Sequence, residues 1–208
     1  MEESVPVTNK PIHAKVVLAG ASGVGKTSIS NRAFEGAFSE DTKPTVGSGF
    51  MKGTINTPRG KVTLEVWDTA GQEHFSSLVP IFFNRASVVI LVYDITDMTS
   101  FNRIDHYVTM VNDKANDDCI IVLAGNKKDL VNSNPSSRQV TTQEAQNLAD
   151  TIGAKYLFEV SALSGENINK IFRSVANDPD LATVSSQEDK IITPQENPHV
   201  EQKKGGCC

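Results

Sequence analysis

The feature that most constrains this chain is a glycine-rich loop, Gly20–Thr27, which follows a short apolar strand predicted over residues 15–19 and opens a helix. Its sequence, GASGVGKT, fits the pattern GxxxxGK[ST]. Glycines let backbone N–H groups curl around a phosphate, and the helix N-terminus adds positive potential. In this pattern Lys26 meets the β/γ-phosphate oxygens and the Thr27 hydroxyl binds Mg²⁺. The alternative, an ordinary glycine-rich turn, is disfavoured by the strand–loop–helix context.

The hydropathy pattern alternates strands with helices, which predicts an α/β fold. Two continuous apolar runs, VVILVY at 88–93 and CIIVLA at 119–124, suit strands buried on both faces of a parallel sheet. Pro58 and Gly60 lie between two further strands and suit a hairpin turn. We expect a doubly wound, mostly parallel six-stranded sheet with one antiparallel hairpin strand and helices on both faces. The expected strands are 15–19, 50–56, 61–67, 88–93, 119–124 and 156–160, and the expected helices are 27–35, 100–114, 142–152 (capped by Thr141 or Thr142) and 168–175.

Composition narrows the class of protein. The 208 residues carry a net charge of −5, which disfavours a fold built mainly to bind nucleic acid. Three cysteines cannot form a disulfide framework, and Cys119 is expected to be an inert core thiol. The first ten residues are polar and residue 2 is not glycine, so we expect neither a signal peptide nor N-myristoylation. No apolar run approaches the ~18 residues of a membrane helix, and the cytosol is the expected compartment.

The expected domain organisation has three parts. Residues 1–12 form a flexible lead-in, and residues 13–177 form one globular domain. Residues 178–208 contain three prolines, few large apolar side chains and no periodicity. Such a composition predicts a disordered tail.

A second motif, Asp68-Thr69-Ala70-Gly71-Gln72, ends the second hairpin strand. An aspartate at this position suits an Mg²⁺ site contacted through water. The N–H of Gly71 can face a γ-phosphate, and the neutral amide of Gln72 can orient an attacking water. A solvated turn is the alternative, and the position after the glycine-rich loop and its hairpin disfavours it.

A third motif, Asn126-Lys127-Lys128-Asp129, follows the apolar strand at 119–124. The carboxylate of Asp129 can accept hydrogen bonds from guanine N1 and N2, a donor pair that adenine lacks. Ser161 and Ala162 end the last strand and can offer a backbone N–H to guanine O6. A match of four residues can also be surface charge, but its place at the end of a buried strand favours base recognition.

These motifs occur in the order and approximate spacing of the Ras-like small GTPases, and residues 13–177 resemble that superfamily. Within it the chain resembles a Rab: Trp67 directly precedes DTAGQE, LVYDIT spans residues 91–96, and the chain ends Gly-Gly-Cys-Cys. The resemblance has departures. Leu163 stands where the family usually has lysine, His74 replaces the usual arginine, and the loop at 131–137 is longer than in relatives.

The resemblance implies roles for individual residues. Catalysis would use Gln72, Lys26, Thr45 and Gly71, and Mg²⁺ would be held by Thr27, Thr45 and, via water, Asp68. The implied nucleotide-binding residues are Ser22, Gly23, Val24, Gly25, Lys26, Thr27, Ser28, Phe38, Thr45, Gly71, Asn126, Lys127, Asp129, Ser161, Ala162 and Leu163. Phe50, Trp67 and Phe82 would form an exposed aromatic trio for effectors; core packing is their alternative.

The chain ends in a vicinal pair, Cys207 and Cys208, that is not a CaaX box. It resembles the Rab ending that receives two geranylgeranyl groups. One lipid chain anchors a protein only marginally, so stable anchoring needs a second signal. The tail from 178 to 206 has six acidic and three basic residues, which leaves little electrostatic attraction to anionic lipid. Both cysteines are therefore expected to be needed. An incidental pair or a disulfide is the alternative.

Together, motifs and resemblance predict a Rab-like GTPase that hydrolyses GTP to GDP and phosphate, slowly by itself and faster with an activating protein. The cofactors are GTP or GDP and Mg²⁺. Acting as a monomer on the cytosolic face of endomembranes, it would regulate vesicle trafficking and cycle with the cytosol. By resemblance its partners are an exchange factor, a GTPase-activating protein, a GDP-dissociation inhibitor, a prenyltransferase with its escort protein, and effectors. Two alternatives stay open, a GTP-dependent scaffold with negligible hydrolysis and an adenine-specific ATPase or kinase.

Overall fold

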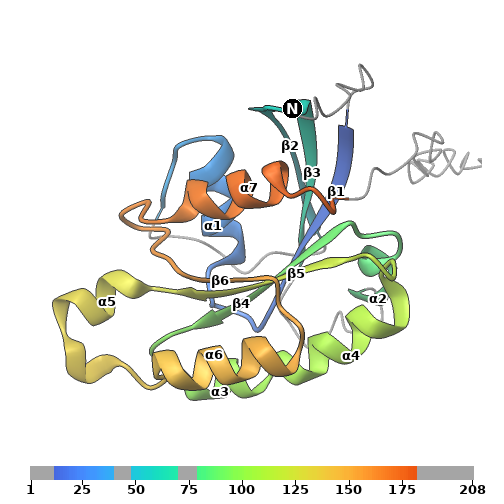
Figure 1. Ribbon diagram of the computed structural model, residues 1–208. Coiled ribbons are helices and arrows are strands. Elements are labelled where there is room, and N and C mark those ends of the chain that lie inside the picture. The colour runs from blue at the N-terminus through green and yellow to red at the C-terminus, as the bar shows by residue number, and fades with distance from the viewer. Residues whose placement is uncertain (1–11, 40–47, 70–78, 182–208) are drawn as a thin grey trace, which may run out of the picture.

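The computed structural model describes residues 12–39, 48–69 and 79–181 of the chain. Its centre is a six-stranded sheet in the order β2-β3-β1-β4-β5-β6 (Figure 1). The expected sheet is thereby confirmed. The strands are β1 (Ile12–Ala19), β2 (Ser48–Thr57), β3 (Gly60–Thr69), β4 (Val88–Asp94), β5 (Ile120–Asn126) and β6 (Tyr156–Glu159).

The two strands joined by a hairpin turn are antiparallel, and the other neighbouring strands are parallel. β2 and β3 pair antiparallel through the turn at Pro58, with Phe50 opposite Trp67. The other four pairings are parallel. In such a sheet the carboxyl ends of β1, β3, β4, β5 and β6 meet at one edge, where α/β proteins place their ligands.

Helices cover both faces of the sheet. α1 (Lys26–Phe34) and α7 (Ile168–Asn177) lie on one face. On the opposite face lie α2 (Val79–Phe83), α3 (Met98–Asn102), α4 (Ile104–Lys114) and α6 (Thr142–Thr151) (Figure 1). α5 (Lys128–Ser133) and a 3₁₀ turn, η2 (Pro135–Ser137), follow β5.

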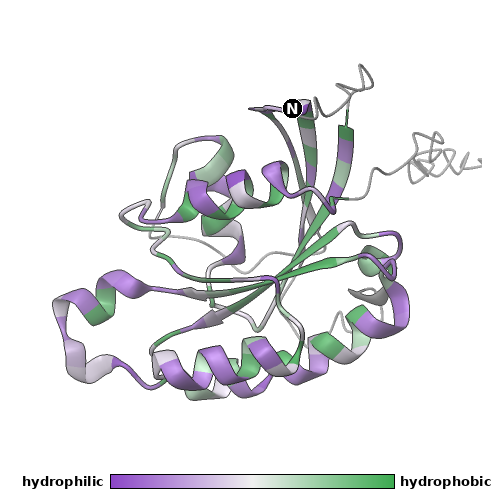
Figure 2. Cartoon of the chain, in the orientation of Figure 1, coloured by the Kyte–Doolittle hydropathy of each residue, from purple (hydrophilic) through white to green (hydrophobic). Residues whose placement is uncertain are grey.

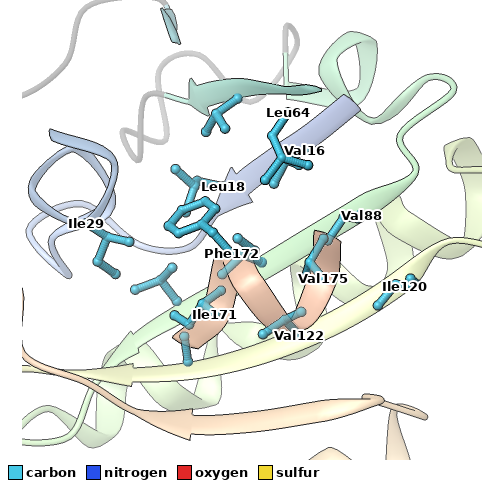
Figure 3. Close-up of a cluster of buried hydrophobic side chains, with 14 of the residues drawn as sticks. Val16, Leu18, Ile29, Leu64, Val88, Ile120, Val122, Ile171, Phe172 and Val175 are labelled. Carbon is cyan, nitrogen blue, oxygen red and sulfur yellow. The ribbon is translucent and has the colours of Figure 1, made fainter. Parts of the chain in front are cut away.

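Each central strand contributes alternate side chains to two cores. In β4, Val88, Ile90 and Val92 belong to the core under α1 and α7, whereas Val89 and Leu91 belong to the core under α4 and α6. The apolar centre and the polar outer helix surfaces are visible in Figure 2. Figure 3 shows the first core, in which α7 inserts its apolar face against the strands. The continuous apolar runs in the sequence therefore reflect burial on both faces.

The prediction of one helix over 100–114 is wrong about where the helix begins and about its being continuous. The structure has two helices, α3 and α4, with a break at Arg103. α3 begins at Met98 because Asp97 caps it, accepting a hydrogen bond from the N–H of Thr99 at 2.9 Å. The Ser100 hydroxyl donates to the carbonyl of Asp97 at 2.7 Å and accepts from the N–H of Asp94 at 2.9 Å, and the second contact ties this first turn to the end of β4.

Other boundaries shift by smaller amounts. The cap at Thr141 is confirmed, because its hydroxyl accepts from the N–H of Glu144 at 3.1 Å in a complete capping box. β1 starts at Ile12, inside the segment expected to be a lead-in, and pairs with β3. The helices α2 and α5 were not expected from the sequence, since both are short and lack a clear amphipathic period.

The packed part of the chain also extends past the expected boundary at 177. Asp178 and Leu181 are 1% and 4% exposed, and Leu181 belongs to the first core. The N–H of Leu181 donates to the carbonyl of Asp178 at 3.2 Å. The expected tail from 178 therefore begins at least four residues too early.

Candidate nucleotide-binding site

The loop between β1 and α1 depends on glycine at two positions. Gly20 has φ +148°, and a Cβ there would lie 2.1 Å from the carbonyl oxygen of Val92. Gly25 has φ +96°, and a Cβ there would lie 2.3 Å from Nδ2 of Asn126. Both the left-handed backbone and the close approach exclude a side chain at Gly25. The rest of the expected loop, including Ser22, Gly23 and Val24, follows this path into α1.

Lys26 opens helix α1 and is 5% exposed. Its Nζ donates to the carbonyls of Gly20 and Ala21, each at 2.8 Å. Burial lowers the pKa of Lys26 to about 8, and the negative charge of Asp68 opposes that shift. The ammonium is thus held inside the loop by neutral carbonyls, and an anion at the loop favours its charged form.

Thr27 and Asp68 come together from different elements. Oγ1 of Thr27 donates to Oδ2 of Asp68 at 2.5 Å. Asp68 is 3% exposed near the end of β3, and the next residue, Thr69, donates from its hydroxyl to the carbonyl of Leu18 at 2.7 Å. A hydroxyl beside a carboxylate supplies the oxygen donors that Mg²⁺ prefers, so these residues fit the ion. Ser28, the next residue of α1, is 9% exposed.

Asn126 joins the loop to the next strand ends. Its side chain is 2% exposed, and Nδ2 donates to the carbonyl of Val24 at 2.8 Å. Its Oδ1 accepts from the N–H of Ala162 at 3.1 Å. The structure therefore pairs this N–H, one of the two at Ser161 and Ala162 that the sequence offers to guanine O6, with the amide of Asn126. Asn126 fastens three segments to one another.

The expected base-recognition residues also lie together. Oγ of Ser161 donates to Oδ1 of Asp129 at 2.5 Å, so the hydroxyl orients the carboxylate. Lys127 has φ +67° and forms an ion pair with Asp94 at the end of β4, with 2.7 Å between Nζ and Oδ2. This pair fixes the Lys127 stem beside the carboxyl ends of β4 and β5.

Phe38 and Leu163 flank this region. Phe38 is partly buried and packs against the first core. Leu163 is 43% exposed. The guanidinium of Arg32, from α1, lies between them: Nε donates to the carbonyl of Ala162 at 2.9 Å, Nη2 donates to the carbonyl of Leu163, and Cζ is 5.7 Å from the centre of the Phe38 ring.

The sequence did not single out Arg32 or Asp94. An arginine in the last turn of a helix reads as an ordinary polar residue, and its partners lie 130 and 131 residues away. Asp94 ends a buried strand, which was an available signal because polar residues at that edge face the ligand.

The three aromatic residues form one contiguous group. The rings of Phe50 and Trp67 are 5.0 Å apart, and those of Trp67 and Phe82 are 5.9 Å apart. Phe50 is 52% exposed, whereas Trp67 and Phe82 are partly buried against the second core. The group is therefore exposed at Phe50 and packed at its other members. Ile81, beside it in α2, is 63% exposed and was not expected.

Five expected residues lie outside the described part of the chain: Thr45, Gly71, Gln72, Cys207 and Cys208. Within the described residues, no group of three or more His, Cys, Asp or Glu side chains could hold a metal ion. Among the same residues, no helix is both long and apolar enough to cross a membrane. Burial raises the pKa of the Cys119 thiol to about 12, which agrees with an inert thiol.

Comparison with known proteins places this geometry in context. The family model described as the Ras family matches residues 15–179. A relative from Dictyostelium discoideum, "Ras-related protein RabC", is 39% identical over 197 residues, covering 93% of this chain and 96% of that protein. A relative from Saccharomyces cerevisiae, "GTP-binding protein YPT53", is 35% identical over 206 residues, covering 93% of each chain.

Proposed function

Because this chain belongs to the Ras family and is a Rab-like GTPase, with the vesicle-trafficking role that follows from that family, we propose that it switches between GTP and GDP forms on the cytosolic face of endomembranes. The proposed site consists of the residues named above. Its phosphate part is the loop from Gly20 to Thr27, and its base part is Asp129 with the segment 161–163.

The observation that carries the proposal is the position of Asn126. Its side chain bonds the phosphate loop at Val24 and the base segment at Ala162, so one residue sets the distance between the two halves. A guanine nucleotide needs both halves at once, because its phosphates and its base lie at opposite ends of the molecule. If the phosphate loop and the base segment were unrelated surface features, a buried side chain joining them would not be needed.

The charge arrangement supports phosphoryl transfer. The buried ammonium of Lys26 can stabilise negative charge on the β/γ-phosphates at the N-terminus of α1. Thr27, Asp68 and Thr45 are the residues that would hold Mg²⁺. When bound, Mg²⁺ neutralises developing charge on the phosphate oxygens. Water would attack the γ-phosphorus in line, with Gln72 orienting it and the N–H of Gly71 on the γ-phosphate.

Hydrolysis is proposed to be slow without help, since no arginine finger is identifiable in the sequence. An activating protein would add about 10³–10⁵-fold to the rate. The test is single-turnover hydrolysis of preloaded GTP by the wild type and by Gln72→Leu, with nucleotide affinity measured beside it. We expect hydrolysis to be lost and binding retained in the variant. Unchanged hydrolysis would exclude Gln72 from the role.

Membrane attachment is proposed through geranylgeranyl groups on Cys207 and Cys208, since two chains anchor stably where one does not. An N-terminally tagged wild type would mark a discrete endomembrane, and the double variant Cys207→Ser/Cys208→Ser would be diffuse. A GDP-dissociation inhibitor would hold the lipids in the cytosolic phase. Equal distributions of the two proteins would remove the anchor from the proposal and leave the nucleotide site in place.

The remaining partners are an exchange factor, an activating protein, a prenyltransferase with its escort protein, and effectors that contact the trio of Phe50, Trp67 and Phe82. The protein is proposed to act as a monomer. Family membership does not favour the scaffold alternative. The carboxylate of Asp129, held by Ser161, does not favour an adenine site either.

A further inference from the structure

We propose that Arg32 is a positioning residue for the nucleotide base, fastening the base-binding segment and the Phe38 ring in one arrangement. This inference rests on the guanine nucleotide site proposed above. It concerns a side chain of helix α1 that the motifs do not include. It also identifies a positively charged side chain beside Leu163, which stands where the family usually has lysine.

The first step is the set of contacts that the guanidinium makes. Nε donates to the carbonyl of Ala162 at 2.9 Å, and Nη2 donates to the carbonyl of Leu163. Nη1 donates to the carbonyl of Gly36 at 3.2 Å. The planar fork of arginine suits such simultaneous contacts, whereas a lysine has a single nitrogen. One side chain therefore ties the loop after β6 to the turn after α1.

The second step is the aromatic contact. Cζ of Arg32 lies 5.7 Å from the centre of the Phe38 ring, within the range of a cation–π interaction. Gly36 and Phe38 belong to the same short segment, so the guanidinium contacts that segment through both its backbone and its ring. Phe38 is one of the expected nucleotide-binding residues, and the family resemblance implies that its ring stacks on the base. Its orientation is thus coupled to the position of the carbonyls of Ala162 and Leu163.

The third step concerns how the loop after β6 is held in place. Segment 161–163 leaves β6 and is fixed on one side by Asn126, which accepts from the N–H of Ala162, and by Asp129, which accepts from Ser161. These contacts hold the start of the loop. Arg32 holds its far side through the carbonyl groups. Leu163 is 43% exposed and has no charged group of its own, and the guanidinium of Arg32, from α1, places a positive charge at its carbonyl.

The test compares Arg32→Met, which keeps the length of the stem and removes the fork, with the wild-type full chain. Arg173→Met is the matched control, because Arg173 is an exposed arginine on the neighbouring helix α7. The measurement is release of a fluorescent GDP analogue. We expect about 10-fold faster release from Arg32→Met and an unchanged rate from the control.

A second readout separates positioning of the base from general weakening of the fold. Competition with GDP, IDP and ADP measures how strongly each protein discriminates among bases. Arg32→Met should lose part of the preference for GDP over IDP and ADP. A role in folding alone would lower the unfolding temperature and leave the order and ratios of the three affinities unchanged, which would overturn the proposal.

Arg32→Lys keeps a positive charge and loses the fork, and it should release GDP at a rate between those of the wild type and Arg32→Met. If Arg32→Met does not fold, Arg32→Lys serves as the test. GDP release at the wild-type rate and wild-type discrimination among GDP, IDP and ADP in Arg32→Lys would then overturn the proposal. Failure of the wild type itself to bind GDP would instead refute the proposed nucleotide site, so the two failures are distinguishable.

Discussion

The side-chain amide of Asn126 donates to the backbone carbonyl of Val24 at 2.8 Å, across 102 residues of sequence. The contact is buried and joins the end of β5 to the loop after β1. Asn126 also lies so close to Gly25 that a Cβ at position 25 would be 2.3 Å from Asn126 Nδ2. The loop and the base segment therefore behave as one unit.

Replacing Asn126 with alanine should weaken nucleotide binding. The carbonyl of Val24 and the N–H of Ala162 would both lose a buried partner, each at a cost of about 1–3 kcal/mol. We expect GDP affinity to fall by about 10- to 100-fold, measured by titration with a fluorescent analogue. Asn169→Ala, at an exposed position on α7, is the control and should bind as the wild type does. Wild-type affinity in Asn126→Ala would contradict this role.

Comparing Thr27→Ala with Thr27→Ser distinguishes the effect of the Thr27 hydroxyl on GDP release from the effect of its methyl group. The serine keeps the donor to Asp68, whereas the alanine removes it. GDP release is measured with Mg²⁺ and after chelation by EDTA. Chelation should speed release from the wild type and the serine variant, because the oxygen donors fit Mg²⁺. The alanine variant should release GDP quickly in both conditions, and a full Mg²⁺ effect in it would exclude Thr27 as a ligand.

Asp129→Asn should change which base is preferred. The carboxylate only accepts hydrogen bonds, whereas an amide also donates, so the donor pair on guanine would face an N–H. We expect GDP affinity to fall by at least about 100-fold and xanthosine diphosphate to compete better than GDP. Competition against a fluorescent nucleotide measures both. Asp113→Asn, on the exposed face of α4, serves as control, and a retained GDP preference in Asp129→Asn would refute base recognition by this residue.

Asp178→Asn should lower stability in a pH-dependent way. Burial by itself raises the pKa of Asp178, but hydrogen bonds from Lys155 Nζ at 2.6 Å and the Tyr156 hydroxyl at 2.7 Å outweigh it, so the pKa lies below its usual value. A lowered pKa stabilises the fold above the unfolded value of about 3.9, and that contribution disappears as pH falls through the folded value. We expect a loss of about 1–3 kcal/mol at pH 7 that shrinks below about pH 4.

The measurement is urea unfolding of both proteins at several pH values, with equal GDP and Mg²⁺. Asp180→Asn is the matched control, because Asp180 contacts the same Lys155 Nζ at 2.7 Å but its side chain is 74% exposed. Exposed ion pairs contribute about 0–1 kcal/mol. A constant difference between wild type and Asp178→Asn down to pH 3 would contradict the assignment.

Much of the sheet could be predicted because its signals are local. The runs at 88–93 and 119–124 are apolar, and residues 88–93 and 120–124 are buried in the structure, as in strands covered on both faces of a sheet. The break between α3 and α4 could not be predicted in the same way. Phe101, Ile104 and Val108 keep a helical spacing across Arg103, so the period hides the break at that residue, and the start at Met98 depends on the cap at Asp97.

The sequence by itself determined the order of the strands along the chain, the path of the glycine-rich loop and the chemical groups at the strand ends, because backbone freedom and periodic burial are properties of adjacent residues. Only the tertiary structure decided which of these groups meet. The contacts of Arg32 with Ala162 and Leu163, of Asn126 with Val24, and of Lys155 with Asp178 depend on how the strands are ordered in space and on how α1 and α7 pack. A one-dimensional pattern records that a residue is polar, whereas the three-dimensional arrangement determines its partner.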